Sequence, residues 1–182
     1  MSGIEVHEQL LSCICAALAA TADSPDLPVV GGYGPVRSDA CCLTHAAGLP
    51  AADYCCEGTD GMGQAWVRTI GFDPVGFSEC GNANSVNETI GTGVYRCSPS
   101  FRNNEGDPPT CDALTLHAKR MRLDADAIRD AVRCCPVLVD ASWQFVTMVP
   151  IGGEGACCGW EYRFRLRWDE PACPIRTPDG LV

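Results

Sequence analysis

The sequence predicts an α+β domain, in which a mainly antiparallel β-sheet packs against one long α-helix. Two patterns carry this prediction: a helical repeat of apolar residues within 110–135, and strict apolar–polar alternation within 142–150 and 159–168. A sheet with one apolar face and a helix with one apolar stripe can bury each other in a shared core. Since 182 residues suffice for one core of normal size, we expect a single domain over 1–168 and a C-terminal tail over 169–182.

The long helix is predicted between Thr110 and Cys135. Thr110 is a suitable N-cap, Asp112 suits the positive end of the helix dipole, and Pro136 is expected to end the helix. Apolar residues recur along one side at alternating spacings of four and three, and are expected to face the sheet: Leu114, Ala118, Met121, Ala125, Ile128 and Val132.

The same helix has a second apolar stripe, on the side opposite the first. It consists of Leu116, Leu123, Ala127 and Cys134. A helix that covers one sheet needs only one apolar stripe. We therefore predict that Leu116, Leu123 and Ala127 contact a neighbouring subunit. The alternative is an ordinary surface with two exposed leucines, which is common.

The remaining elements follow from shorter patterns. Residues 4–20 predict an N-terminal helix, with Val6, Leu10, Cys13 or Ile14, and Leu18 on its buried side. Strands are expected at 65–72, 89–98, 142–150 and 159–168. The segment 21–64 is rich in Gly, Pro, Asp and Cys and has no sustained period, so it is predicted to be a long, irregular, cysteine-bearing loop.

The last strand has the clearest alternation of the chain. Its aromatic and aliphatic residues are expected on one face, and Glu161 and a ladder of three arginines on the other: Arg163, Arg165 and Arg167. Such a ladder could contact phosphate. The acidic N-terminal half or a neighbouring subunit is the better match, so we include the three arginines in the predicted oligomer interface.

Charge is distributed unevenly. The formal net charge is −10, and residues 1–64 carry eight Asp and Glu against one Arg, whereas residues 111–182 carry ten against nine basic residues. This balance argues against nucleic-acid binding through bulk charge. No apolar run reaches the roughly 20 residues of a membrane span, and Glu5 and Glu8 occupy the place of a basic signal-peptide region. We expect no membrane association.

Fourteen cysteines are present, four of them within the irregular loop. Cys41, Cys42, Cys55 and Cys56 are our candidates for disulfides that pin this loop, in an oxidising environment such as a virion surface. Adjacent cysteines on a strand point to opposite faces, so each member of a pair needs its own partner. A zinc site and free buried thiols are the alternatives, although no CxxC spacing occurs.

The search for catalytic motifs finds none. GxSxG, HExxH and P-loop patterns are absent, and no GxGxxG lies between a strand and a helix. Paired acids such as Asp124 and Asp126 lie on a predicted helix face, where solvated charge is the default. We therefore expect no enzyme activity, no cofactor and no metal.

Several segments together resemble the tail terminator proteins of long-tailed bacteriophages, most closely the cysteine-rich neck proteins of actinobacterial phages. They are CICAAL (13–18), DYCCEG (53–58), VYRCSPS (94–100), PPTCDAL (108–114), DADAIRDAVRCC (124–135) and GACCGWEYRFRLRW (155–168). The order helix, strand, strand, long helix, strand hairpin is also similar, and the resemblance covers most of residues 4–168. The loop at 21–63 is bulkier than a minimal terminator needs.

The resemblance implies a structural virion protein without an active site. Proteins of this kind are assembled in the host cytoplasm and form a homo-oligomeric ring, usually a hexamer, at the head–tail junction. The ring caps the tail tube, joins it to the head connector and lets genomic DNA pass without specific binding. A head-closure (stopper) or adaptor protein of the same neck is the alternative. From a different class, a monomeric cysteine-rich interaction module, with or without zinc, also fits the composition.

Overall fold

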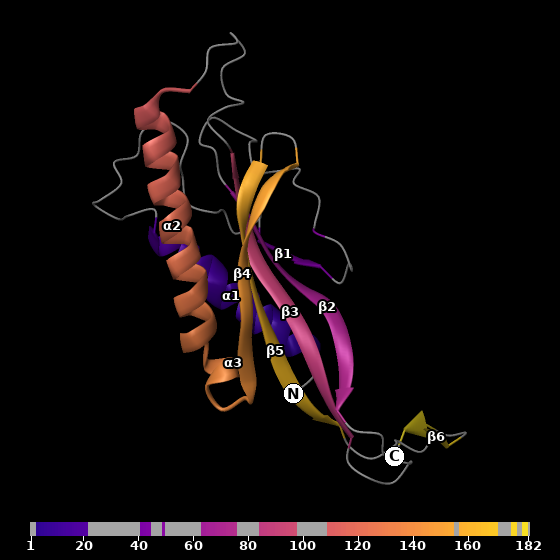
Figure 1. The fold of residues 1–182 in the computed structure, drawn as a ribbon. Coiled ribbons are helices and arrows are strands. Elements are labelled where there is room, and N and C mark those ends of the chain that lie inside the picture. The colour runs from indigo at the N-terminus through magenta and orange to yellow at the C-terminus, as the bar shows by residue number, and fades with distance from the viewer. Residues whose placement is uncertain are drawn as a thin grey trace.

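A computed structural model describes residues 3–21, 41–44, 49, 63–75, 84–97, 109–154, 157–170, 176–177 and 180–181. It confirms the predicted α+β class (Figure 1). The main sheet has five strands in the order β1-β2-β3-β5-β4, and all its pairings are antiparallel except that of β1 with β2. The strands are β1 (Cys41–Thr44), β2 (Gln64–Val75), β3 (Asn84–Cys97), β4 (Trp143–Glu154) and β5 (Cys157–Glu170).

Two segments predicted to be irregular contribute to this sheet. Strand β1 lies inside the 21–64 loop, where its four residues are too few to show an alternating pattern. The stretch between the predicted strands 65–72 and 89–98 also contributes, because β2 extends to Val75 and β3 begins at Asn84. Within the predicted tail, Arg176–Thr177 and Gly180–Leu181 pair as strands β6 and β7.

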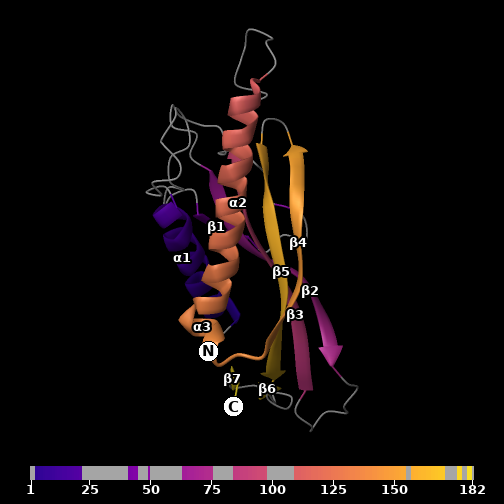
Figure 2. The ribbon, with the colours of Figure 1, turned by 60° about the vertical axis from the view of Figure 1, so that its left-hand side comes forward.

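The helices are α1 (Gly3–Thr21), α2 (Cys111–Cys134) and the short α3 (Pro136–Val139). Figure 2 shows α1 and α2 on the same side of the sheet. The Thr110 side chain caps α2 by accepting a hydrogen bond from the Ala113 backbone at 3.2 Å, as predicted. Pro136 ends α2 and also begins α3, where proline at the first position costs no helical hydrogen bond.

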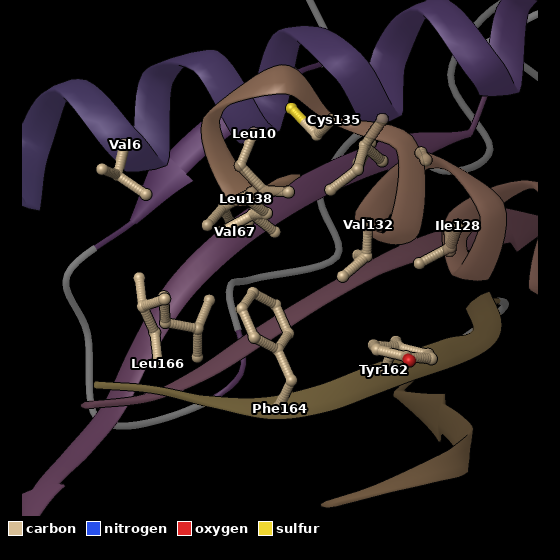
Figure 3. Close-up of a cluster of buried hydrophobic side chains, with 14 of the residues drawn as sticks. Val6, Leu10, Val67, Ile128, Val132, Cys135, Leu138, Tyr162, Phe164 and Leu166 are labelled. Carbon is tan, nitrogen blue, oxygen red and sulfur yellow. The ribbon is translucent and has the colours of Figure 1, made fainter. Parts of the chain in front are cut away.

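The core lies between the two helices and the sheet (Figure 3). Helix α1 buries one stripe at intervals of four residues, on the side predicted: Val6, Leu10, Ile14 and Leu18. Opposite it lie Val67 of β2 and the residues Tyr162, Phe164 and Leu166 of β5. Ile128 and Val132 of α2 close the core from the second helix.

The predicted buried stripe of α2 is wrong in its N-terminal half. Ala125, Ile128 and Val132 are buried, but Leu114 is 46% exposed and Ala118 is also exposed. Asp124, predicted to carry solvated charge, is buried instead, and Arg120 is buried beside it. The reason is a partner that the helical repeat does not reveal: Asp124 pairs with Arg96 of β3, so α2 turns these charged residues toward the sheet.

The predicted alternation of β4 breaks at a bulge between Phe145 and Thr147. Before the bulge Phe145 lies opposite Phe164, and after it Met148 lies opposite Tyr162. The extra residue therefore puts Phe145 and Met148 on the same, helix-covered face. The other face of the sheet has a small apolar cluster of its own, made by Trp66, Tyr95, Ile151 and Cys157. The sheet is therefore buried on both faces around Trp66 and Tyr95.

Candidate functional site

The predicted interface residues of α2 do not lie on the side of the helix that faces away from the core. Leu116, Leu123 and Ala127 are half-buried, and Ala127 packs against the core. This flank faces α1, because the neighbouring Arg120 is hydrogen-bonded to the Thr21 carbonyl. Their role in an interface stays a prediction.

The outward side of α2 is charged. Arg122 and Arg129 both pair with Asp126, and Arg129 also pairs with Asp130. These side chains are substantially exposed, so each pair stabilises the helix only weakly.

The arginine ladder of β5 lies on the helix-free face, as the alternation predicts. Arg163 pairs with buried Glu161, Arg165 lies 3.9 Å from Asp73, and Arg167 donates to Ser85. Arg165 and Arg167 are exposed. They can therefore contact another molecule, while Arg163 is partly committed within the chain.

Behind Arg163 lies a buried ion pair that the sequence did not predict. Arg68 of β2 donates to both carboxylate oxygens of Glu161, at 2.9 and 3.1 Å. Both side chains are almost completely buried. This pair joins β2 to β5 across β3, where Gly91 leaves the necessary room: a Cβ there would lie 3.1 Å from the Glu161 carboxyl carbon.

A second buried cluster joins the sheet to α2. Arg96 donates to both carboxylate oxygens of Asp124 at 2.8 and 2.9 Å, and Arg120 lies 3.6 Å from the same carboxylate. The side chains of Arg96 and Asp124 are fully buried. Hydrogen bonds between charged groups depend strongly on geometry. This buried contact of two arginines with one carboxylate therefore holds α2 in one position on the sheet.

His117 and Cys158 meet beside this cluster, with Nε2 and Sγ 3.1 Å apart. Burial lowers the pKa of His117, and Arg96 adds to this effect while Asp124 opposes it. Burial also raises the pKa of the Cys158 thiol. Both shifts favour the neutral forms, whereas a nucleophilic cysteine needs a thiolate. The geometry is that of a packed thiol–imidazole pair.

We therefore predict that Cys158 reacts slowly with iodoacetamide. Cys111 and Cys134 are free and exposed, whereas Cys158 is free but half-buried. Mass spectrometry after brief alkylation of the native protein should find Cys134 labelled well before Cys158. Faster labelling of Cys158 would show an activated thiol and would contradict this description.

A third buried pair, His7 and Glu88, joins α1 to β3. Nε2 of His7 lies 3.0 Å from Oε1 of Glu88, and Thr69 and Trp168 donate to the same carboxylate. Burial raises the pKa of Glu88, but the hydrogen bonds from these groups and the charge of His7 outweigh it, so the net pKa is lowered. His7 therefore has a structural role, since it ties α1 to the sheet.

A lowered pKa of Glu88 makes the stability of the fold pH-dependent. The stabilisation is present above the ordinary glutamate pKa of 4.5 and is lost as the pH falls through the lowered value. Glu88→Gln should therefore lower the free energy of unfolding at pH 7. It should also make this free energy fall less steeply as the pH is lowered. Urea unfolding of both proteins between neutral and acid pH measures this, and identical pH slopes would contradict it.

Some of the described cysteines are disulfide-bonded and others are free. Cys13 of α1 and Cys135 after α2 form a disulfide, and Cys15, Cys97 and Cys157 are also disulfide-bonded. In each of the pairs 134–135 and 157–158 one member is bridged and the other is free. The candidates Cys41 and Cys42 lie in β1 with side chains outside the described residues, and Cys55 and Cys56 lie outside them altogether. Their disulfides stay a prediction.

The search for a metal or a membrane site gives little. Among the described residues, no three His, Cys, Asp or Glu side chains gather as a metal site requires. Helix α1 is long and apolar enough to span a membrane, although no such span was expected from the sequence. Its apolar stripe is packed in the core, which accounts for that composition.

No protein-family model matches the chain, and no curated protein matches it. Three clusters of charged side chains are buried and tie one element to the next: Arg68–Glu161, Arg96–Asp124–Arg120 and His7–Glu88. The charged pairs on the outward side of α2, the arginines Arg165 and Arg167 and the outer edge of β4 are exposed.

Strand β4 is the outermost strand on its side of the sheet and pairs only with β5 within the described chain. Its segment 143–149 contains no charged residue. Phe145 and Val146 are 50% and 42% exposed. Edge strands in soluble proteins usually carry charges or prolines that prevent pairing with other chains, and this segment has neither.

Proposed function

We propose that this chain is a structural subunit of the neck of a long-tailed phage, and specifically a tail terminator. In this role, copies of the chain form a ring, with six as the expected number, at the head–tail junction. The ring caps the tail tube, joins it to the head connector and allows DNA to pass without specific binding. The particle is assembled in the host cytoplasm.

The observation that carries the proposal is the order of the elements. Helix α1, strands β2 and β3, the long α2 and the hairpin β4–β5 follow one another as the resemblance implies. The short parallel strand β1 is an addition to that order.

The surfaces are consistent with assembly. Both α1 and α2 cover one face of the sheet (Figure 2). Arg165 and Arg167 are exposed on the other face. The uncharged β4 edge offers a second contact surface. Exposed arginines and an uncharged edge strand can both contact other proteins.

The disulfide between Cys13 and Cys135 also supports a protein of the finished particle. Disulfides persist in oxidising surroundings, and a particle released by lysis is exposed to such surroundings.

A monomeric cysteine-rich module is the competing class. Native mass spectrometry separates the two, since a ring subunit should give a multimer or associate with increasing concentration.

Removal of the gene from the producing phage tests the proposal. A missing terminator should give tails that extend beyond their normal length and heads that remain unattached. Tails of normal length beside heads that leak DNA would instead indicate the alternative head-closure role. Intact, infectious particles would contradict any essential role in the neck.

A further inference from the structure

We infer that the arginines on the helix-free face of the sheet are the contact surface for helix α1 of a second copy of this chain. In this contact, the exposed guanidinium groups of β5 receive the glutamates at the start of that helix. This inference rests on the proposed function only in taking a second copy as the partner.

The helix-free face of the sheet is open only in part. Around Trp66 and Tyr95 it is covered within the chain, and both side chains are fully buried. Further along β5 the face is open, because Arg165 and Arg167 are exposed and the side chain of Arg163 is 35% exposed. These three residues form a basic strip along one strand.

The basic strip carries more positive charge than the nearby carboxylates neutralise. Buried Arg68 already donates to both oxygens of Glu161, and Arg163 contacts the same carboxylate, so two guanidinium groups share one negative charge. Asp73 lies 3.9 Å from Arg165, and since both side chains are exposed this pair is weak. A basic strip on a chain of net charge −10 favours an acidic partner.

Helix α1 supplies an acidic surface among the described residues. Its buried stripe faces the sheet, so its outer stripe faces away and consists of Glu5, Glu8, Gln9, Ser12, Ala16 and Ala20. The helix contains no Lys or Arg that could offset the two glutamates. Because α1 covers the other face of the sheet (Figure 2), its outer stripe points away from the basic strip of the same copy.

The two charged surfaces match in spacing. Arg163 and Arg165 are alternate residues of a strand, so they are about 7 Å apart along it. Glu5 and Glu8 lie on neighbouring turns of a helix, with about 5–6 Å between their Cβ atoms. The contact joins two different surfaces, so it repeats from copy to copy and closes into a ring when the rotation allows it.

Helix α2 is a poorer match for the basic strip, although its outward side also carries exposed acids. Asp126 is already paired there with Arg122 and Arg129, and Asp130 is paired with Arg129. Packing this side on the basic strip would bring arginines against arginines, which opposes association. Of the two long helices, only α1 presents acids without bases.

Reversing the charge of Arg165 tests the contact in the full chain. Arg165→Glu places a negative charge against the glutamates of α1 and should weaken association about tenfold or more. Arg122→Glu is the matched control, because the side chain of Arg122 is 74% exposed on α2, and it should leave association unchanged. Sedimentation velocity over a wide concentration range measures association, and circular dichroism confirms that each variant is folded.

The partner surface is tested by Glu8→Arg, which should weaken association to a similar extent. An equimolar mixture of Glu8→Arg and Arg165→Glu should associate again, because the first variant keeps an intact basic strip and the second keeps an intact α1. Recovery in the mixture, together with an unchanged Arg122→Glu protein, supports the inference.

Three results overturn it: a monomer at every concentration, equal association of Arg165→Glu and Arg122→Glu, or a mixture that associates no better than its components. All these measurements use the purified protein, whereas the neck function is tested by tail length in the gene-deleted phage. The contact and the neck function can therefore fail separately.

Discussion

Replacing Asp124 by alanine is expected to lower the free energy of unfolding by about 3–5 kcal/mol. The carboxylate is fully buried, accepts two hydrogen bonds from Arg96 and lies 3.6 Å from Arg120. Without it, two guanidinium groups remain buried without their anion. Urea unfolding followed by circular dichroism measures the loss.

Asp126 is the matched control, since it lies two residues along the same helix and pairs with Arg122 and Arg129 at the surface. Asp126→Ala should change the stability by no more than about 1 kcal/mol. Replacing Arg96 and Asp124 together by apolar residues should recover part of the loss, because no unpaired charge of the Arg96–Asp124 pair then remains. Equal losses of stability in Asp124→Ala and Asp126→Ala would show that the buried cluster does not hold α2 on the sheet.

Removing the disulfide between Cys13 and Cys135 is the second change with a large expected effect. The two cysteines are separated by 122 positions in the chain, and the bond joins α1 to the end of α2. Closing a long loop restricts the unfolded chain, so Cys13→Ala should destabilise the protein by about 2–4 kcal/mol. Thermal unfolding under non-reducing conditions provides the measurement.

Cys134 supplies the control for this experiment, because it is adjacent to Cys135 but free and exposed. Cys134→Ala should leave the unfolding temperature almost unchanged. Reduction with dithiothreitol should lower the stability of wild type by more than that of Cys13→Ala, because the other disulfides are reduced in both proteins. Equal stability of both cysteine variants would contradict its role.

Repetitive patterns made the fold predictable. The apolar stripe of α1, the alternation of β5 and the cap at Thr110 each depend on local spacing, and each occurs as expected. Strand β1 could not be predicted, because its four residues are held by pairing with β2 and carry no period of their own.

The buried charges could not be predicted for a related reason. Arg96 and Asp124 are 28 positions apart, and Arg68 and Glu161 are 93 apart, so nothing local identifies them as pairs. A weak signal was present: Arg68 follows the apolar run Ala65–Val67 and Arg96 follows Val94 and Tyr95, and an unpaired charge buried beside such residues would be costly. The helical repeat of α2 therefore gave the correct helix but a buried face turned away from Asp124.

The edge of β4 was also missed, because an edge is a property of the sheet order and not of one strand. Sequence alone placed Phe145 and Val146 in a strand but could not show that, among the described residues, this strand pairs only with β5. The predicted interface on the second stripe of α2 and the edge strand β4 are different surfaces of the described chain.

An electron cryomicroscopy reconstruction of the intact phage particle tests the proposed neck function most directly. The account predicts a ring of copies at the head–tail junction, on the end of the tail tube, with each copy showing the two helices on one side of the five-stranded sheet. Density for this fold in the tail tip or the head shell, or the absence of the protein from purified particles, would contradict it.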